Sequence, residues 1–136
     1  MKRQLFGRAF FLLVVLAVLF FLGYVFYLQW AFWWFDMVLH FLGGAVVAMG
    51  GVATWLYLFP ETNSDITKII LTALFWVIFI GILWELYEVH FGITFLSDGI
   101  VYVRDTASDL IMDICGGIFG VLYTLRLSSK KTLQIL

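Results

Sequence analysis

The stretch "WWFDMVLHFLGG", residues 33–44, places an acid and a histidine inside an otherwise apolar segment. Asp36 and His40 are four positions apart, so a helix would carry both side chains on one face. Gly43 and Gly44 follow, and small residues let helices approach closely in lipid. The stretch therefore predicts a membrane-spanning helix with one polar face that packs against other helices.

The composition of the whole chain supports a membrane protein. Of its 136 residues, 64% are hydrophobic, 20% aromatic and 12% charged, and the mean hydropathy is +1.06. Soluble domains are about 45–50% apolar and about 25% charged, so a soluble protein is excluded. We expect membrane lipids as partners and no nucleic acid. Cys115 is the single cysteine, so no intrachain disulfide can form, and its apolar surroundings predict a buried side chain.

Four segments are long enough to cross a bilayer, which takes about 20 residues. We expect one membrane domain over residues 1–136, with spans at about 9–28, 36–59, 68–90 and 105–127. The first apolar run is too long for a signal peptide and is followed by no cleavage site, which indicates a retained helix. The connection 91–104 could form a hairpin around Ser97-Asp98-Gly99 or a lid on the membrane surface.

The basic residues predict the orientation, because short cytoplasmic loops are rich in Lys and Arg. A four-span arrangement places seven of them on one side and only Arg104 on the other; the seven are Lys2, Arg3, Arg8, Lys68, Arg126, Lys130 and Lys131. The sequence therefore predicts an all-α, multi-pass bundle of four transmembrane helices in the bacterial inner membrane, with both termini cytoplasmic.

Most of the acids fall within or at the ends of the spans. They are Asp36, Glu85, Glu88, Asp105, Asp109 and Asp113. With a rise of about 1.5 Å per helical residue, His40, Glu85 and Asp109 lie roughly 6 Å below the outer boundary, and Asp113 roughly 12 Å below it. Three helices thus bring polar groups to one level, which predicts a shared site that opens outward.

This concentration of acids predicts a bound cation. An ionised carboxylate in apolar surroundings costs several kcal/mol, and only Arg104 lies near enough to offset the charge. Either several acids are protonated, or a divalent metal neutralises them. The expected metal ligands are Asp36, His40, Glu85 and Asp109, and the expected catalytic proton carriers are Glu88 and Asp113. Mixed imidazole and carboxylate ligands suit zinc, manganese or iron, whereas carboxylates alone suit magnesium or calcium.

Several of these residues also have plainer explanations. The side chains nearest the interface could be solvated helix ends; these are Asp36, Glu88, His90 and Asp105. His40 could be an interhelical hydrogen-bonding residue. We expect Asp105, His90 and Gly117 to support the site. The Gly116-x-x-x-Gly120 spacing could mark a dimer face, although packing within the bundle is the simpler interpretation.

Three ordered stretches carry a family resemblance. "FDMVLHFLGG", "WELYE" and "VRDTASDLIMDICGG" resemble the motifs of VanZ-like small bacterial membrane proteins and are closest to the YjdF-type branch. The match covers roughly residues 35–120, with Asp36, His40, Glu85, Glu88, Asp105, Asp109, Asp113 and Gly117 at the matching positions. The chain has Glu88 and Asp113 where VanZ-type proteins usually have Gln and Asn. The resemblance implies a cell-envelope protein, connected with glycopeptide resistance in some relatives.

Three functions fit the sequence. The first is a metal-dependent hydrolase or transferase that acts on a lipid or a lipid-linked envelope substrate at the outer leaflet. The second is cation- or proton-coupled transport. A complete pore in one protomer is disfavoured because the inner halves of the spans offer little polarity beyond Thr54, Tyr57, Thr72 and Tyr123, but a homo-oligomer could build one. The third is a non-catalytic envelope protein with a structural metal.

Overall fold

The chain consists of helices joined by short turns. The computed structural model describes residues 2–60 and 65–133, and every regular element in these ranges is a helix. The elements are α1 (Lys2–Val25), α2 (Leu28–Ala31), α3 (Trp33–Leu58), α4 (Ile66–Phe91), the 3₁₀ helix η2 (Leu96–Asp98) and α5 (Ile100–Leu133). Four of them, α1, α3, α4 and α5 up to Leu127, are long and apolar enough to cross a membrane. The predicted four-helix membrane bundle is confirmed.

The helices extend beyond the predicted apolar runs. α1 begins at Lys2, because the basic start of the chain contains no residue that interrupts a helix. α5 begins at Ile100 rather than at Asp105, so Asp105 lies within the helix. The hairpin alternative for residues 91–104 is wrong, since this segment contains no strand. The segment forms η2 and ends at Gly99, whose φ of 58° favours glycine.

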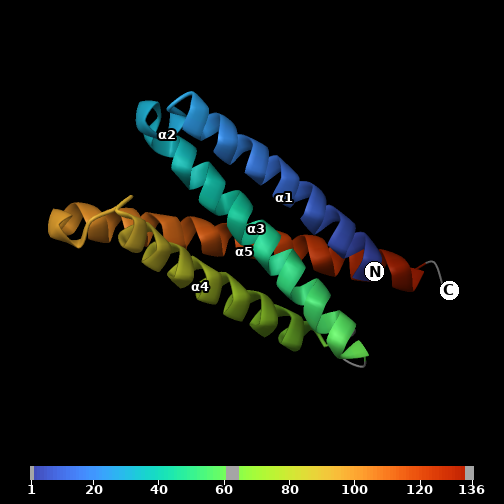
Figure 1. Cartoon of the computed structure of the whole chain (residues 1–136). Coiled ribbons are helices and arrows are strands. Elements are labelled where there is room, and N and C mark those ends of the chain that lie inside the picture. Colours follow the sequence, from blue (N-terminus) through green and yellow to red (C-terminus); the bar gives the residue numbers. More distant parts are fainter. Residues whose placement is uncertain (1, 61–64, 134–136) are drawn as a thin grey trace.

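α3 is the central helix of the bundle. It packs against α1, α4 and α5, and its most extensive contact is with α5. α1 runs beside α3, whereas α4 and α5 meet near η2 and diverge towards their other ends (Figure 1). The buried apolar core includes Leu5 of α1, Val52 and Leu56 of α3, and Ile69 and Val77 of α4.

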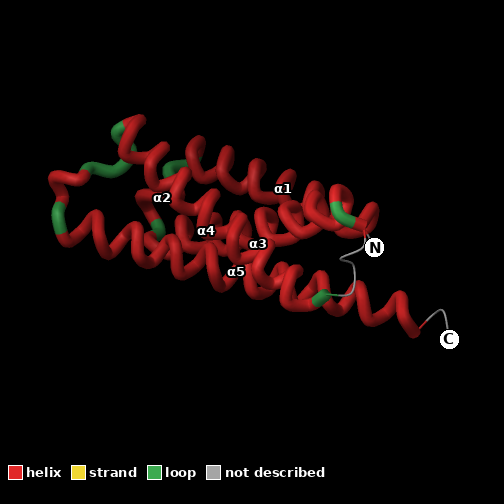
Figure 2. The backbone as a smooth tube through the Cα atoms, turned by 90° about the horizontal axis from the view of Figure 1, so that it is seen from below, coloured by secondary structure: helices red, strands yellow, loops and turns green. Residues whose placement is uncertain are grey.

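The two ends of the bundle differ in charge. α1 begins and α5 ends at the same end of the molecule, and the end of α3 lies there too (Figure 2). We call this the basic end, because it carries the described cations Lys2, Arg3, Arg8, Lys68 and Arg126. Arg8 donates a hydrogen bond to the Tyr123 hydroxyl and so ties α1 to α5. The opposite end, formed by α2 and η2, is called the α2/η2 end.

Glycines bring the backbones of α3 and α5 into contact. A Cβ atom on Gly44 would lie 2.0 Å from the backbone oxygen of Asp113, and one on Gly116 would lie 1.8 Å from that of Phe41. A Cβ on Gly120 would lie 2.9 Å from the backbone oxygen of Ala45. The Gly116-x-x-x-Gly120 face is therefore used for packing within the chain. Cys115 is exposed instead of buried, because it projects from a different side of α5.

α4 has well-defined caps at both ends. Asp65 is the N-cap residue, and its Oδ1 accepts a hydrogen bond of 3.2 Å from the backbone amide of Lys68. This hydrogen bond, which favours the carboxylate, lowers the pKa of Asp65 below its ordinary value. Gly92 ends the helix with a φ of 68°. The caps set the limits of α4 and so the height at which its acids lie.

Candidate functional site

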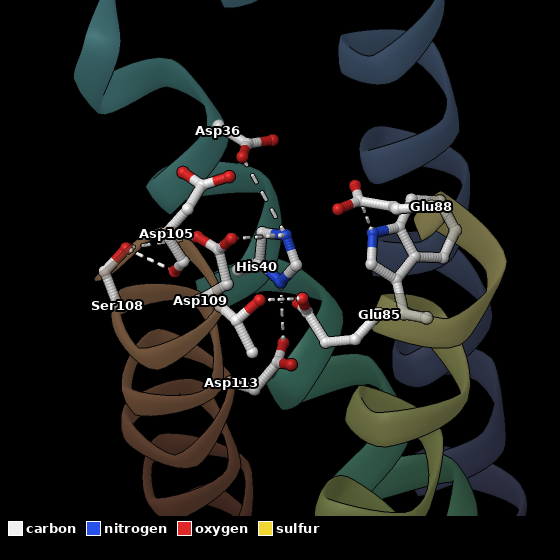
Figure 3. Close-up of polar contacts among 10 residues, drawn as sticks. Asp36, His40, Glu85, Glu88, Asp105, Ser108, Asp109 and Asp113 are labelled. Atoms are coloured by element: carbon white, nitrogen blue, oxygen red, sulfur yellow. Dashed lines mark hydrogen bonds and ion pairs between the residues drawn. The ribbon is translucent and has the colours of Figure 1, made fainter. Parts of the chain in front are cut away.

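His40 of α3 lies at the centre of a cluster of carboxylates near the α2/η2 end (Figure 3). Its Nε2 is 4.0 Å from Asp36 Oδ2 and 3.9 Å from Asp109 Oδ2. Its Nδ1 is 3.4 Å from Asp113 Oδ1. The two ring nitrogens thus face different partners, two carboxylates on one side and a single one on the other.

The α3–α5 packing places these groups together. Asp36 and His40 share one face of α3, and Asp109 and Asp113 share one face of α5. The Gly44 contact with the backbone of Asp113 holds the two helices at minimum separation just below His40. Close packing of small residues is what allows short acidic side chains to reach the imidazole from the neighbouring helix.

α4 contributes two further buried carboxylates. Glu85 Oε2 accepts a hydrogen bond of 2.5 Å from the Thr106 hydroxyl of α5. Glu85 Oε1 is buried and has no hydrogen-bond partner among the described residues. Glu88 Oε1 accepts a hydrogen bond of 2.9 Å from Trp84 Nε1. Because buried polar atoms are nearly always paired, Glu85 Oε1 is available to a further partner.

Four of the predicted residues meet around His40, whereas the predicted ligand Glu85 is hydrogen-bonded to Thr106 and lies outside the group of three possible ligands. Asp36, His40 and Asp109 offer three ligand atoms that all lie within 4.8 Å of one another. The predicted catalytic residue Asp113 lies against His40, whereas the other, Glu88, is paired with Trp84.

Other predicted residues have a solvated or a packing environment. His90 is exposed in the last turn of α4, as expected for a solvated helix end, and Asp105 is exposed as well, although it lies within α5. Glu88, for which the same explanation was open, is buried. Gly117 packs against Val77, where a Cβ would come within 2.9 Å of a methyl group.

The sequence analysis missed three residues that contact the acids. They are Trp84, Thr106 and Ser108, whose hydroxyl donates to the backbone oxygen of Asp105 at 2.7 Å. Trp84 is four residues before Glu88, and Thr106 shares a helix face with Asp109 and Asp113. The helical spacing therefore indicates that Trp84 and Thr106 lie beside the acids, although neither residue is ionisable.

No described Lys or Arg forms an ion pair with these acids. Among residues 2–60 and 65–127, the only basic partner of Asp36, Asp109 and Asp113 is His40. Arg104 is exposed and has no ion pair in the same ranges. One imidazole therefore faces several buried or half-buried acids, and keeping them all ionised without a further cation would be costly in apolar surroundings.

The cluster lies below an aromatic belt. Trp30, Trp33 and Trp34 are exposed at the α2/η2 end, and aromatic residues of this kind favour the headgroup level of a bilayer. Asp36 follows directly, with its side chain 35% exposed, whereas Asp109 is only 2% exposed. The site thus opens towards the headgroup level and closes towards the membrane interior.

Comparison with known proteins places the chain in a family. The family described as "Predicted membrane protein (DUF2238)" matches residues 3–130, nearly the whole chain and all of the residues of the cluster. No curated protein and no solved structure matches the chain. The chain belongs to the DUF2238 family of predicted membrane proteins.

Proposed function

We propose that the His/carboxylate cluster binds a divalent metal ion and acts on the headgroup of a lipid or lipid-linked substrate at the outer face of the membrane. The observation that carries the proposal is the convergence of Asp36, His40 and Asp109 from two helices. Their separations of 3.9 and 4.0 Å from His40 Nε2 are too long for hydrogen bonds. Two atoms that each lie about 2.1 Å from one zinc ion can be at most about 4.2 Å apart. Both separations from His40 Nε2 are below this limit.

The geometry supports a separate role for most of these residues. Asp36, His40 and Asp109 would hold the metal. Glu85 lies outside this group of three, and its buried, unpaired Oε1 makes it a candidate for a further ligand. Asp113 would position His40, because metal-binding histidines usually give their second nitrogen to a carboxylate or carbonyl. Glu88 would carry a proton, held in place by Trp84.

A bound metal would activate a water molecule or polarise a phosphoryl or carbonyl oxygen. The entrance of the site is marked by two acids, the half-exposed Asp36 and the exposed Asp105. Glu88, the proposed proton carrier, lies next to the cluster on α4. A lipid substrate is favoured because the site lies next to the aromatic belt, where headgroups reside. The resemblance to VanZ-like proteins and the distribution of basic residues favour a bacterial cell envelope and an outward-facing site.

Metal content tests the proposal directly. The protein is purified in mild detergent without chelator, supplied with zinc or manganese, and analysed by elemental mass spectrometry. We expect near-stoichiometric metal in the parent and in His90→Ala, a matched control at the other, exposed histidine. We expect its loss in His40→Ala and Asp109→Asn. Equal metal in all four proteins, or none in the parent, would overturn the metal site.

Activity is tested separately with the metal-loaded protein. Vesicles that contain phosphatidylglycerol or a polyprenyl pyrophosphate are incubated with the parent and with Glu88→Gln, and the release of headgroup or phosphate is measured. We expect release by the parent alone. A protein that binds metal but releases nothing from either lipid would support the structural-metal alternative.

Proton or cation transport is the second candidate, and one observation disfavours it. Towards the basic end, the hydroxyls of Thr54 and Thr124 donate to the backbone oxygens of Gly50 and Gly120 in their own helices. The Tyr123 hydroxyl accepts from Arg8. These three groups already have hydrogen-bond partners, which disfavours a polar path through them from the cluster to the basic end in the described part of one protomer.

A further inference from the structure

The divergence of α4 and α5 leaves an apolar groove in the basic half of the bundle. Its volume is about 390 Å³, and every side chain that lines it is aliphatic or glycine. The walls include Ile70, Leu74 and Val77 of α4 and Ile118, Leu122 and Leu125 of α5. The residues that line the groove include none of the His/carboxylate cluster.

The groove lies in the membrane-crossing parts of both helices, within Ile66–Phe91 and Ile100–Leu127. Its rim is open to the lipid, since Ile70, Leu74, Ile118 and Leu122 are all exposed. Apolar cavities of this kind take up hydrocarbon and stay free of water. The occupant must therefore be apolar where it lies between the helices.

A second copy of the chain is a poor occupant. Helices associate in membranes through small residues that allow close approach. The groove contains two such residues, and both are used inside the bundle: Ala73 is only 1% exposed, and Gly117 is covered by Val77. The remaining walls are branched aliphatic side chains, which suit a flexible hydrocarbon chain better than a rigid helix.

The charge at the mouth of the groove selects the headgroup. Arg126 directly follows the lining residue Leu125, and Lys68 is two residues before the lining residue Ile70. Lys68 is 3.4 Å from Asp65, whereas Arg126 is exposed and forms no ion pair with a residue in 2–60 or 65–127. Long basic side chains near helix ends reach the headgroup region, where they attract anionic lipids.

We infer that the groove between α4 and α5 binds an anionic phospholipid of the leaflet at the basic end, with one acyl chain between the helices and the headgroup phosphate at Arg126. The binding site is separate from the proposed metal site and does not depend on it. The matched cation for comparison is Arg104, which is also exposed but lies at the α2/η2 end.

Photo-cross-linking tests this inference. The protein is placed in phosphatidylcholine vesicles that contain a trace of phosphatidylglycerol with a diazirine in one acyl chain, and the labelled peptides are mapped by mass spectrometry. We expect labelling to concentrate on residues 70–77 and 114–125. Unlabelled phosphatidylglycerol should compete about fivefold better than phosphatidylcholine, the effect of roughly one basic side chain at a membrane surface.

Paired variants separate groove binding from general lipid contact. Leu74→Trp fills the groove and should reduce labelling several-fold, whereas Ile82→Trp, at a similarly exposed position of α4 outside the groove, should leave it unchanged. Arg126→Ala should remove most of the preference for phosphatidylglycerol, and Arg104→Ala should keep it. Even labelling of all exposed helices, or equal competition by both lipids, would overturn the inference. A further check introduces Leu74→Cys in a Cys115→Ala background. Cross-linking between two protein copies at this cysteine would also overturn the inference.

Discussion

At the scale of single residues, the two nitrogens of His40 define two kinds of carboxylate. Asp109 faces Nε2, together with Asp36, and Asp113 faces Nδ1. A carboxylate that only positions a metal-binding histidine contributes less to metal affinity than a carboxylate that binds the metal itself. The expected loss of metal affinity for such a residue is about 10–100-fold.

Asp113→Asn should therefore weaken metal binding by about 10–100-fold, whereas Asp109→Asn should abolish it. Competition with a metal-sensitive dye in detergent measures both affinities. Asp105→Asn is the control, since Asp105 is exposed and no contact of its side chain with His40 is present in the described structure. If Asp113→Asn and Asp109→Asn lost binding equally, Asp113 would be a ligand itself.

The Thr106–Glu85 hydrogen bond joins α5 to α4 and should contribute measurably to stability. Thr106→Val keeps the shape of the side chain but removes the donor. Hydrogen bonds to charged groups are worth about 1.5–3 kcal/mol, and we expect the free energy of unfolding to fall by that amount.

Unfolding in mixed detergent micelles, followed by circular dichroism, gives the comparison. Ser108→Ala serves as the control because its hydroxyl bonds mainly to a backbone oxygen within its own helix, so its cost should stay below about 1 kcal/mol. A neutral Thr106→Val would mean that Glu85 is held by other contacts.

At the scale of the helices, the α3–α5 contact leaves no room for a methyl group. Gly116→Ala would place a carbon 1.8 Å from the Phe41 backbone oxygen, which only a separation of the two backbones can relieve. We expect it to lower the free energy of unfolding by about 3 kcal/mol or more, at the upper end of overpacking costs.

Gly50→Ala provides the contrast within the same bundle. No atom lies within 4 Å of the position that its Cβ would take, and alanine favours a helix over glycine by about 1 kcal/mol. It should be neutral or stabilising. Thermal unfolding in detergent compares the two variants, and similar melting temperatures would refute the tight contact.

The N-cap of α4 gives a pH dependence at the basic end. Hydrogen bonding from Lys68 lowers the pKa of Asp65, so its ionised form favours the folded state. Ionised Asp65 therefore adds to the free energy of unfolding above its ordinary, unfolded-state pKa of about 4. This stabilisation is lost as the pH falls through the lower pKa that Asp65 has in the folded state.

Asp65→Asn retains a good N-cap but removes the charge. The parent should therefore melt at a higher temperature than the variant at pH 7, and the difference should shrink as the pH is lowered below the ordinary pKa of Asp65, about 4. Melting curves at pH 7 and at lower pH check this. A difference that persists unchanged in acid would exclude ionisation of Asp65 as its cause.

At the scale of the whole molecule, the charge difference between the two ends predicts the orientation. Single cysteines at Ser97, between α4 and α5, and at Thr67, at the start of α4, report on opposite ends of the bundle. In a Cys115→Ala background, a membrane-impermeant maleimide applied to intact cells should label the cysteine at Ser97 and spare the one at Thr67. The reverse labelling pattern would mean that the His/carboxylate cluster faces the cytoplasm, which contradicts the proposed orientation.

Much of this arrangement could be predicted from the sequence. Hydropathy and length predicted the four membrane-crossing helices, and the alternation of helix directions predicted His40, Glu85 and Asp109 at one level, with Asp113 deeper. Helical spacing alone could not predict which nitrogen of His40 faces which acid, because that depends on the crossing of α3 and α5. The start of α5 at Ile100 was missed because its first residues, Ile-Val-Tyr-Val, are β-branched or aromatic and favour a strand in isolation, whereas they extend the helix in the folded chain.

The contact between Gly44 and Asp113 links the assembly of the bundle to its chemistry. The residue whose side chain faces His40 Nδ1 is also one whose backbone oxygen lies directly against a glycine of the neighbouring helix. Anything that binds between Asp36, His40 and Asp109 joins the same two helices that the glycines join. Occupancy and helix association then form one cooperative equilibrium, so a ligand of this site should raise the melting temperature of the whole protein. By the same linkage, mutations that loosen the glycine contact should weaken binding without altering a single ligand atom.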